Sequence, residues 1–217
     1  MICQLDSYPR SCSLLAFSKN FCINDVDTID LKYMSKRLSL QHIDKKVRSL
    51  IYEEDHQKDV LIEGVKMIPL KNHVVEDGDF SELITLNEKG EFDAVPGFKF
   101  TQLNRTRLLP HSVKAWHLHL FKDEIWYIAP IFQLFVGLWD VREKSKTKGK
   151  TMRLSLGGGA SHLLYIPAGV AKGSANFTYQ EINLYFFVNK RYNTSDPDEK
   201  RLKWDILGEG FWNMQKK

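Results

Sequence analysis

The sequence predicts an all-β domain, a sandwich or barrel such as a double-sheet jelly roll, preceded by a helical extension. All 13 glycines of the 217-residue chain lie at or after Gly64, so composition changes sharply there. Beyond that point, short runs rich in β-branched and aromatic residues alternate with turn signals, which is typical of such β folds. We therefore expect a helical arm over residues 1–60 and the β domain over residues 61–217.

The arm is predicted from apolar residues that recur at helical spacing. We expect these stripes to pack against the β domain or against a second subunit, since the arm carries no cluster of chemically reactive groups. The two stripes consist of Leu31, Met34 and Leu38, and of Ile43, Val47, Leu50 and Ile51.

The strands of the β domain are predicted from apolar, β-branched runs bounded by glycine-containing turns. Turn signals include Lys89-Gly90, Lys148-Gly149 and the run of glycines at 157–159. A basic stretch over 142–153 is expected at a solvated hairpin tip, with phosphate contact as the alternative. The expected strands are 65–69, 98–104, 113–121, 125–129, 132–141, 151–156, 163–166 and 182–188.

Composition excludes several classes of protein. With 43% hydrophobic, 12% aromatic and 27% charged residues the chain can bury a core, and its net charge of +4 is small for a nucleic-acid binder. No apolar run approaches the roughly 18 residues of a membrane helix, and the first residues show no basic region or long apolar run, so we expect no secretion signal. Cys3, Cys12 and Cys22 form no metal or disulfide pattern. We therefore expect a cytoplasmic protein without nucleic-acid or membrane partners.

The most informative local pattern is a pair of histidines on the strand at 113–121. Alternation puts His117 and His119 on one face and Lys114 and Trp116 on the other. If the histidine face lines the interior, both imidazoles share a space where burial can tune their pKa values. The alternative is that one of them is a structural histidine.

These residues carry a resemblance to a known family. His117 and His119 followed by Glu124 fit the first cupin motif, and residues 167–176 fit the second, with Lys172 in place of its histidine. From about residue 62 onward the chain resembles the dTDP-4-dehydrorhamnose 3,5-epimerases, a cupin family. The matching segments are 61–66, 114–117, 140–142, 145–150, 166–171, 192–193 and 202–205, together with Trp212.

The resemblance implies a jelly-roll epimerase that needs no metal or cofactor and abstracts a proton alpha to the carbonyl of a nucleotide-linked 4-keto-6-deoxy sugar. Such a proton requires a positioned base and stabilisation of the enolate oxygen. By motif, His117 is the expected base, Asp205 its carboxylate partner and Tyr185 the acid, with Tyr192 as the second choice. A homodimer is also implied, because one subunit of the family contributes to the other's site.

Expected substrate-binding residues follow from the same motifs. Lys114 and Lys172 are expected to hold substrate charge or polarise the carbonyl, whereas Asp77 stands where the family has a phosphate-binding arginine. The family's enolate-stabilising lysine has no clear counterpart, and Lys122 is the nearest one. The expected substrate-binding set is Lys114, His119, Lys172, Asn104, Gln102 and Tyr192.

Alternatives remain open at this point. His117, His119 and Glu124 could bind Fe(II), Mn(II) or Zn(II) in a metal-dependent cupin, although Lys172 replaces the fourth ligand. A nucleotide-sugar 3,4-ketoisomerase and a non-catalytic sugar-binding cupin are the others. Asp205 could instead only cap a turn, and Tyr185 could be a core residue.

Overall fold

The computed structural model describes residues 38–52 and 61–214, and the chain divides into two units at residue 55. In the first unit, regular structure within 38–52 consists of η2 (Leu40–His42) and α1 (Lys45–Arg48). Val47 of the second predicted stripe lies on α1 and is exposed. Leu31 and Met34 of the first stripe lie outside the described residues. The arm and its boundary at residue 60 stay predictions.

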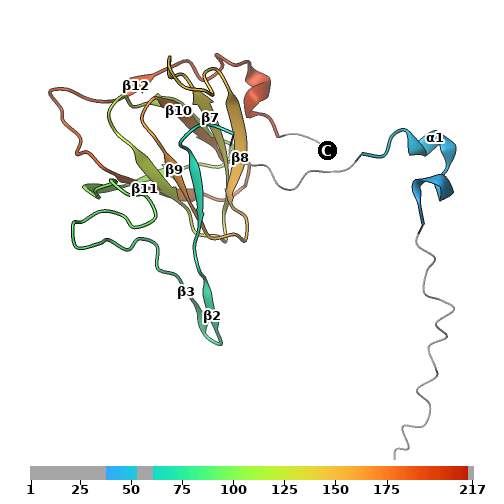
Figure 1. The fold of residues 1–217 in the computed structure, drawn as a ribbon, viewed down its shortest axis with the longest axis horizontal. Coiled ribbons are helices and arrows are strands. Elements are labelled where there is room, and N and C mark those ends of the chain that lie inside the picture. The colour runs from blue at the N-terminus through green and yellow to red at the C-terminus, as the bar shows by residue number, and fades with distance from the viewer. Residues whose placement is uncertain (1–37, 53–60, 215–217) are drawn as a thin grey trace, which may run out of the picture. The chain divides into compact units, whose positions relative to one another are not determined.

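The second unit is a jelly roll of two antiparallel five-stranded sheets with a small additional hairpin, which confirms the predicted fold class (Figure 1). One sheet has the order β1 (Lys66–Pro69), β9 (His162–Ile166), β6 (Glu124–Tyr127), β11 (Ile182–Val188), β4 (Gln102–Leu108). The other has the order β12 (Lys200–Arg201), β5 (Val113–Leu118), β10 (Val170–Ala175), β7 (Gln133–Asp140), β8 (Thr151–Gly157). The hairpin joins β2 (His73–Val75) to β3 (Gly78–Phe80).

The main core lies between the two sheets. Leu108, Leu164 and Leu184 from the first sheet and Leu138 and Val170 from the second belong to one buried cluster. Burying a leucine or valine side chain contributes about 1.5–3 kcal/mol, so this layer is the main source of stability. The inward faces of the strands thus hold the two sheets together around the cavity described below.

A second apolar layer covers the second sheet. Trp116 and Phe135 pack there with Trp212 from η3 (Glu209–Trp212). A Cβ atom on Gly137 would lie 2.6 Å from the Phe211 ring, so the sheet needs glycine at this contact. The Trp212 indole N–H donates to the carbonyl oxygen of Trp204 at 2.8 Å. This layer therefore fixes the segment that carries Trp204.

The basic hairpin between β7 and β8 is tied to the domain through one buried carboxylate. Asp140 is fully buried and accepts from Arg142 Nε at 2.8 Å, from Thr147 Oγ1 at 2.6 Å and from Ser145 Oγ. These hydrogen bonds hold the pKa of Asp140 well below its usual range. The start of the hairpin is thus anchored by charge-assisted hydrogen bonds.

A β-bulge changes which side chains face the space between the sheets. Lys172 pairs with His117, but Ser174 pairs with Lys114, so β5 carries one extra residue opposite β10. Lys114 therefore lies on the same face as His117. The alternation predicted from the sequence is wrong for Lys114, because a bulge shifts the two-residue period by one.

Within 38–52 and 61–214, no helix is both long and apolar enough to cross a membrane.

Candidate active site

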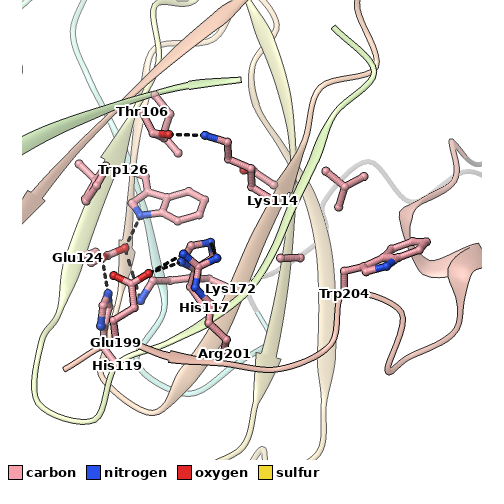
Figure 2. Close-up of a pocket in the computed structure, with 15 residues that line it drawn as sticks. Thr106, Lys114, His117, His119, Glu124, Trp126, Lys172, Glu199, Arg201 and Trp204 are labelled. Carbon is pink, nitrogen blue, oxygen red and sulfur yellow. Dashed lines mark hydrogen bonds and ion pairs between the residues drawn. The ribbon is translucent and has the colours of Figure 1, made fainter. Parts of the chain in front are cut away.

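A cavity of about 480 Å³ lies between the two sheets, and side chains from both sheets line it (Figure 2). Its apolar wall includes Trp126, Leu184 and Phe186. The charged and ionisable residues on its lining are Lys114, His117, His119, Glu124, Lys172, Glu199 and Arg201. A polar ligand that enters this cavity meets fixed charges of both signs.

His117 on β5 has a hydrogen-bond partner at each ring nitrogen. Its Nδ1 lies 3.2 Å from Glu199 Oε1, and its Nε2 lies 2.9 Å from Arg201 Nη1. A guanidinium group can only donate, so Nε2 accepts and the ring proton sits on Nδ1, where it is donated to Glu199. Nε2 therefore carries the lone pair that a base needs.

The surroundings of His117 keep its ring neutral. Burial lowers the pKa of His117, and the charge of Arg201 lowers it further, while Glu199 opposes both effects. Partial burial acts to raise the pKa of Glu199, but Arg201 and His117 outweigh it, so that pKa is lowered. The pair is thus a neutral imidazole beside a carboxylate.

A buried ion pair, formed by Lys172 and Glu124, lies next to the His117–Glu199 pair. Glu124 Oε2 lies 3.5 Å from Lys172 Nζ and accepts from Trp126 Nε1 at 2.6 Å, while Glu124 Oε1 lies 2.9 Å from His119 Nε2. Lys172 and Glu124 are 2% and 3% exposed. Both charges are out of water, so each depends on the other for compensation.

The pKa values follow this geometry. Burial acts to raise the pKa of Glu124, but the charge of Lys172 and the hydrogen bonds from His119 and Trp126 outweigh it and hold the pKa at about 2. Burial lowers the pKa of Lys172, and Glu124 opposes this effect. Glu124 is therefore a carboxylate throughout the physiological range, and its charge favours the protonated form of Lys172 against the effect of burial.

His119 links the cavity floor to the C-terminal segment. Its Nδ1 contacts the carbonyl oxygen of Asp198, and its Nε2 faces Glu124. The Asp198 carboxylate accepts from the backbone N–H groups of Leu120 at 2.7 Å and Phe121 at 2.9 Å. These bonds fix the chain just before Glu199. Both ring nitrogens of His119 are therefore occupied, so His119, which the sequence predicted as a substrate-binding residue, has no ring nitrogen left to face a substrate.

The three side chains proposed as metal ligands, His117, His119 and Glu124, are not arranged around a common point. Glu124 is engaged by His119 and Lys172, and His117 is engaged by Glu199 and Arg201. Within the two described segments of the chain, no group of three histidine, cysteine, aspartate or glutamate side chains is arranged to hold a metal ion. The predicted set of His117, His119 and Glu124 is thus split between two separate clusters.

The predicted partner of His117 is not beside it. Asp205 is exposed and does not line the cavity; its carbonyl oxygen accepts from the Gly208 N–H at 2.7 Å in a turn. Glu199 occupies the expected position instead. The physical reason is the short strand β12, which pairs Arg201 with His117 and so brings Glu199 to the same place.

The predicted acid faces the wrong way. Tyr185 lies on β11 between Leu184 and Phe186, which both line the cavity, so alternation directs Tyr185 to the opposite face. Its exposed fraction is 36%. Tyr192 is exposed as well and donates its backbone N–H to Gln102 Oε1 at 3.1 Å. Neither tyrosine lines the cavity.

The remaining predicted residues divide by position. Lys114, His119 and Lys172 line the cavity, and Lys114 Nζ donates to Thr106 Oγ1 at 2.8 Å. Gln102 and Asn104 alternate with Thr106 on β4 and so share its inward face, although they are not part of the lining. The Gln102 amide donates to Asn104 Oδ1 at 2.6 Å.

Sequence reasoning missed Glu199 and Arg201. Trp204 belongs to the matching segment 202–205, but it was not predicted to line the site. Glu199 and Arg201 are two residues apart, the spacing that puts side chains on one face of a strand. The stretch around them is charged and contains proline, and its strand is two residues long, so the pattern is typical of a loop. Only the pairing with β5 reveals their role.

Comparisons with known proteins identify relatives of this chain. The spore coat polysaccharide biosynthesis protein SpsL of Bacillus subtilis is 35% identical over 156 residues, which span 71% of this chain and 99% of the relative. The probable low-salt glycan biosynthesis epimerase Agl13 of Haloferax volcanii is 29% identical over 107 residues, 49% of this chain and 69% of the relative. No protein-family model matches the chain.

Solved structures share the fold. A dTDP sugar isomerase from Desulfovibrio desulfuricans has a TM-score of 0.58 at 24% identity, with 71% of this chain and 91% of that chain covered. A Legionella pneumophila epimerase in complex with dTDP-4-keto-L-rhamnose has a TM-score of 0.61 at 20% identity, with 73% and 84% covered. The chain therefore belongs, as a divergent member, to the dTDP-4-dehydrorhamnose 3,5-epimerase-like family of the cupin superfamily.

Proposed function

We propose that the protein is an isomerase that epimerises a nucleotide-linked 4-keto-6-deoxy sugar by abstracting a proton alpha to its carbonyl. The observation that carries the proposal is the His117–Glu199 pair, which lies beside the buried Lys172 in one cavity. The names of the relatives, a spore coat polysaccharide protein and a glycan epimerase, support a place in the synthesis of such polymers.

His117 is the base in this mechanism. Its Nε2 lone pair takes the proton from the carbon next to the carbonyl, and the bonding electrons move to the carbonyl oxygen, which becomes an enolate oxygen. Glu199 holds the Nδ1 proton and stabilises the imidazolium that forms. A positioned base of this kind accelerates a reaction about 10²- to 10⁴-fold.

Lys172 is the group that stabilises the enolate oxygen. It is the cross-strand partner of His117, and side chains of such pairs lie about 5 Å apart at Cβ. Its ammonium is held in a dry site by Glu124, where a hydrogen bond to a developing negative charge is strong. Lys172 therefore takes the part that the family's loop lysine plays, and Lys114 is left to bind substrate near Thr106.

The returning proton comes from water in this proposal. No tyrosine from the described residues belongs to the cavity lining, whereas Lys114 and Trp204 on the lining are exposed to solvent. Protonation of the enolate carbon from the side opposite His117 inverts the stereocentre and regenerates the ketone. No oxidation or reduction takes place.

The comparisons favour the epimerase over the other candidates. One relative is named as a probable epimerase, and the structural neighbours are named as a sugar isomerase and an epimerase, which supports this proposal over a metal-dependent cupin enzyme or a sugar-binding cupin. The ketoisomerase alternative uses the same proton abstraction and differs in where the proton returns. The identity of the product separates the two.

Solvent deuterium uptake tests the proposal. The protein is incubated in D₂O with dTDP-4-keto-6-deoxyglucose and followed by proton NMR, beside a His117→Ala variant whose folding is checked by circular dichroism. Loss of the C3 or C5 proton signal with wild type alone supports enolate chemistry and identifies the carbon. Equal exchange by the variant, or none by the wild type, contradicts the proposal.

The proposal includes the cytoplasmic homodimer expected from the sequence. Conversion of nucleotide-activated sugars takes place where their nucleotide precursors are made, which is the reason for the location. Sedimentation equilibrium measures the oligomeric state directly: a mass near twice 25.3 kDa supports the dimer, and a mass near 25.3 kDa contradicts it.

A further inference from the structure

The atom that the proposed base needs is covered by an arginine. Arg201 Nη1 lies 2.9 Å from His117 Nε2, and Arg201 Nη2 lies 2.8 Å from Glu199 Oε1 (Figure 2). The guanidinium thus bridges both members of the dyad. While this contact lasts, the Nε2 lone pair is engaged and cannot accept a proton from a substrate carbon.

Arg201 is placed so that it can leave. Its side chain is 59% exposed, and it lies on β12, a two-residue strand at the edge of its sheet. Moving this side chain away from His117 therefore removes no core packing. Lys172, on a central strand of the same sheet, is 2% exposed and has no such freedom.

A phosphate group in the cavity would be a stronger partner for Arg201 than the neutral His117 imidazole is. Lys114 is a second exposed cation on the same lining, so an anion that enters the cavity meets two exposed cations. A guanidinium binds a phosphate through two parallel charge-assisted hydrogen bonds, which are about twice as strong as neutral ones. Without a ligand, the guanidinium makes one bond to the uncharged Nε2 and one to the Glu199 carboxylate, and a phosphate held by two hydrogen bonds would replace both.

We propose that Arg201 is a specificity-determining residue: the anionic diphosphate of the substrate draws its guanidinium away from His117 Nε2 and so exposes the base. This inference rests on the proposed function, since it assumes His117 as base and a sugar nucleotide as substrate. It adds a mechanism by which binding at the non-reacting part of the substrate enables the chemical step.

A substrate without a phosphate should not displace Arg201 from His117. A free 4-keto-6-deoxy sugar leaves Arg201 on Nε2, so the wild type exchanges its alpha proton slowly even at saturating sugar. In Arg201→Met the base is always exposed. We expect the ratio of kcat for the sugar nucleotide to kcat for the free sugar to fall about ten-fold or more in that variant, while KM for the sugar nucleotide rises.

An NMR titration tests the arginine movement without turnover. Histidine is labelled with nitrogen-15, and the His117 Nε2 resonance is assigned with His117→Ala. Adding dTDP or inorganic diphosphate is expected to shift this resonance in the wild type as the Arg201 contact is lost; thymidine, which has no phosphate, is expected to leave it in place. In Arg201→Met the resonance starts at the released position and stays there.

Controls keep the two proposals apart. Arg107→Gln removes an exposed arginine that pairs with Glu181 and does not line the cavity, so it should behave as wild type. Arg201→Gln is the second variant if the methionine variant folds poorly. An unmoved Nε2 resonance in the wild type at saturating dTDP and diphosphate overturns the inference, as does an unchanged kcat ratio in Arg201→Met. Failure of deuterium exchange by the wild type instead contradicts the proposed function.

Discussion

Lys172 and Glu124 form a buried ion pair, with 3.5 Å between Nζ and Oε2 and side-chain exposures of 2% and 4%. Lys172 stands where the second cupin motif has a histidine, and Glu124 is the glutamate of the first motif. The two motif positions thus meet across the cavity, from opposite sheets, and place the Lys172 amine beside His117. The same pair links the chemistry of the site to the stability of the domain.

Removing one member of this pair should destabilise the protein strongly. Lys172→Met leaves the buried Glu124 carboxylate with His119 and Trp126 as its remaining partners. Breaking a buried ion pair in this way costs about 3–5 kcal/mol. The double variant Lys172→Met/Glu124→Gln removes both charges, so its loss in the free energy of unfolding should be smaller than the sum of the two single losses. Urea denaturation measures all three; strictly additive losses would contradict the coupling.

Acid should destabilise the wild type through Glu124. Its pKa is about 2 in the folded protein and 4.5 without the fold, so the unfolded state binds more protons between these values. The stability that Glu124 contributes is complete above 4.5 and is lost as the pH falls toward 2. Urea midpoints measured across this range should fall less steeply in Glu124→Gln; parallel curves for the two proteins would rule out this contribution.

Glu199, rather than Asp205, should govern the activity of His117. Glu199→Gln keeps the shape but cannot stabilise the imidazolium, so kcat should fall on the order of 10²-fold or more. Asp205→Asn changes an exposed side chain in a turn outside the cavity, and kcat should stay within about two-fold of wild type. Steady-state kinetics on both variants decide between the two carboxylates, and the opposite ranking would restore Asp205 as the partner.

Substitutions of Glu199 and Arg201, the two neighbours of His117, should shift the pH profile of kcat/KM in opposite directions. Burial and Arg201 lower the pKa of His117, so the acidic limb of kcat/KM should lie below pH 6.5. Glu199→Gln removes a stabiliser of the imidazolium and should move this limb to lower pH. Arg201→Gln removes a repelling cation and should move it to higher pH. Shifts in the same direction would contradict the arrangement around the ring.

The contact of the C-terminal aromatic residues with the sheet should tolerate no side chain at Gly137. A Cβ atom there would lie 2.6 Å from Phe211 and 2.8 Å from Trp212. Gly137→Ala should therefore cost about 1–3 kcal/mol as an overpacked site. Gly210→Ala meets no atom within 4 Å and serves as the matched control in thermal unfolding. Equal unfolding midpoints for the two variants would show that Phe211 and Trp212 can move enough to accommodate a Cβ atom at position 137.

Motif spacing was enough to predict the family and the jelly roll, and both are confirmed. The same spacing predicted His117 in a cavity and placed Lys172 in the second motif, and both residues line the cavity. The strand β10 itself was not predicted. Every residue of it is buried, so its sequence lacks the alternation that marks a half-exposed strand.

The errors in the predicted site have two physical causes. Strand alternation alone excludes Tyr185 from the cavity, because its apolar neighbours Leu184 and Phe186 lie on the opposite face of the same strand. Lys114 was assigned to the wrong face because a bulge leaves no mark in a single sequence. Local rules give the face of a regular strand and fail where the partner strand changes the register.

The sequence by itself determined the strand that carries His117 and the positions of the two cupin motifs, and through them several of the chemical groups available to the site. Only the tertiary structure decided that Glu199 and Arg201, more than 80 residues beyond His117, would complete it. Strand β12, which carries Arg201 and directly follows Glu199, is two residues long and forms by pairing with β5 at a sheet edge. Such a pairing depends on the geometry of the assembled sheet, and no local pattern in the chain encodes it.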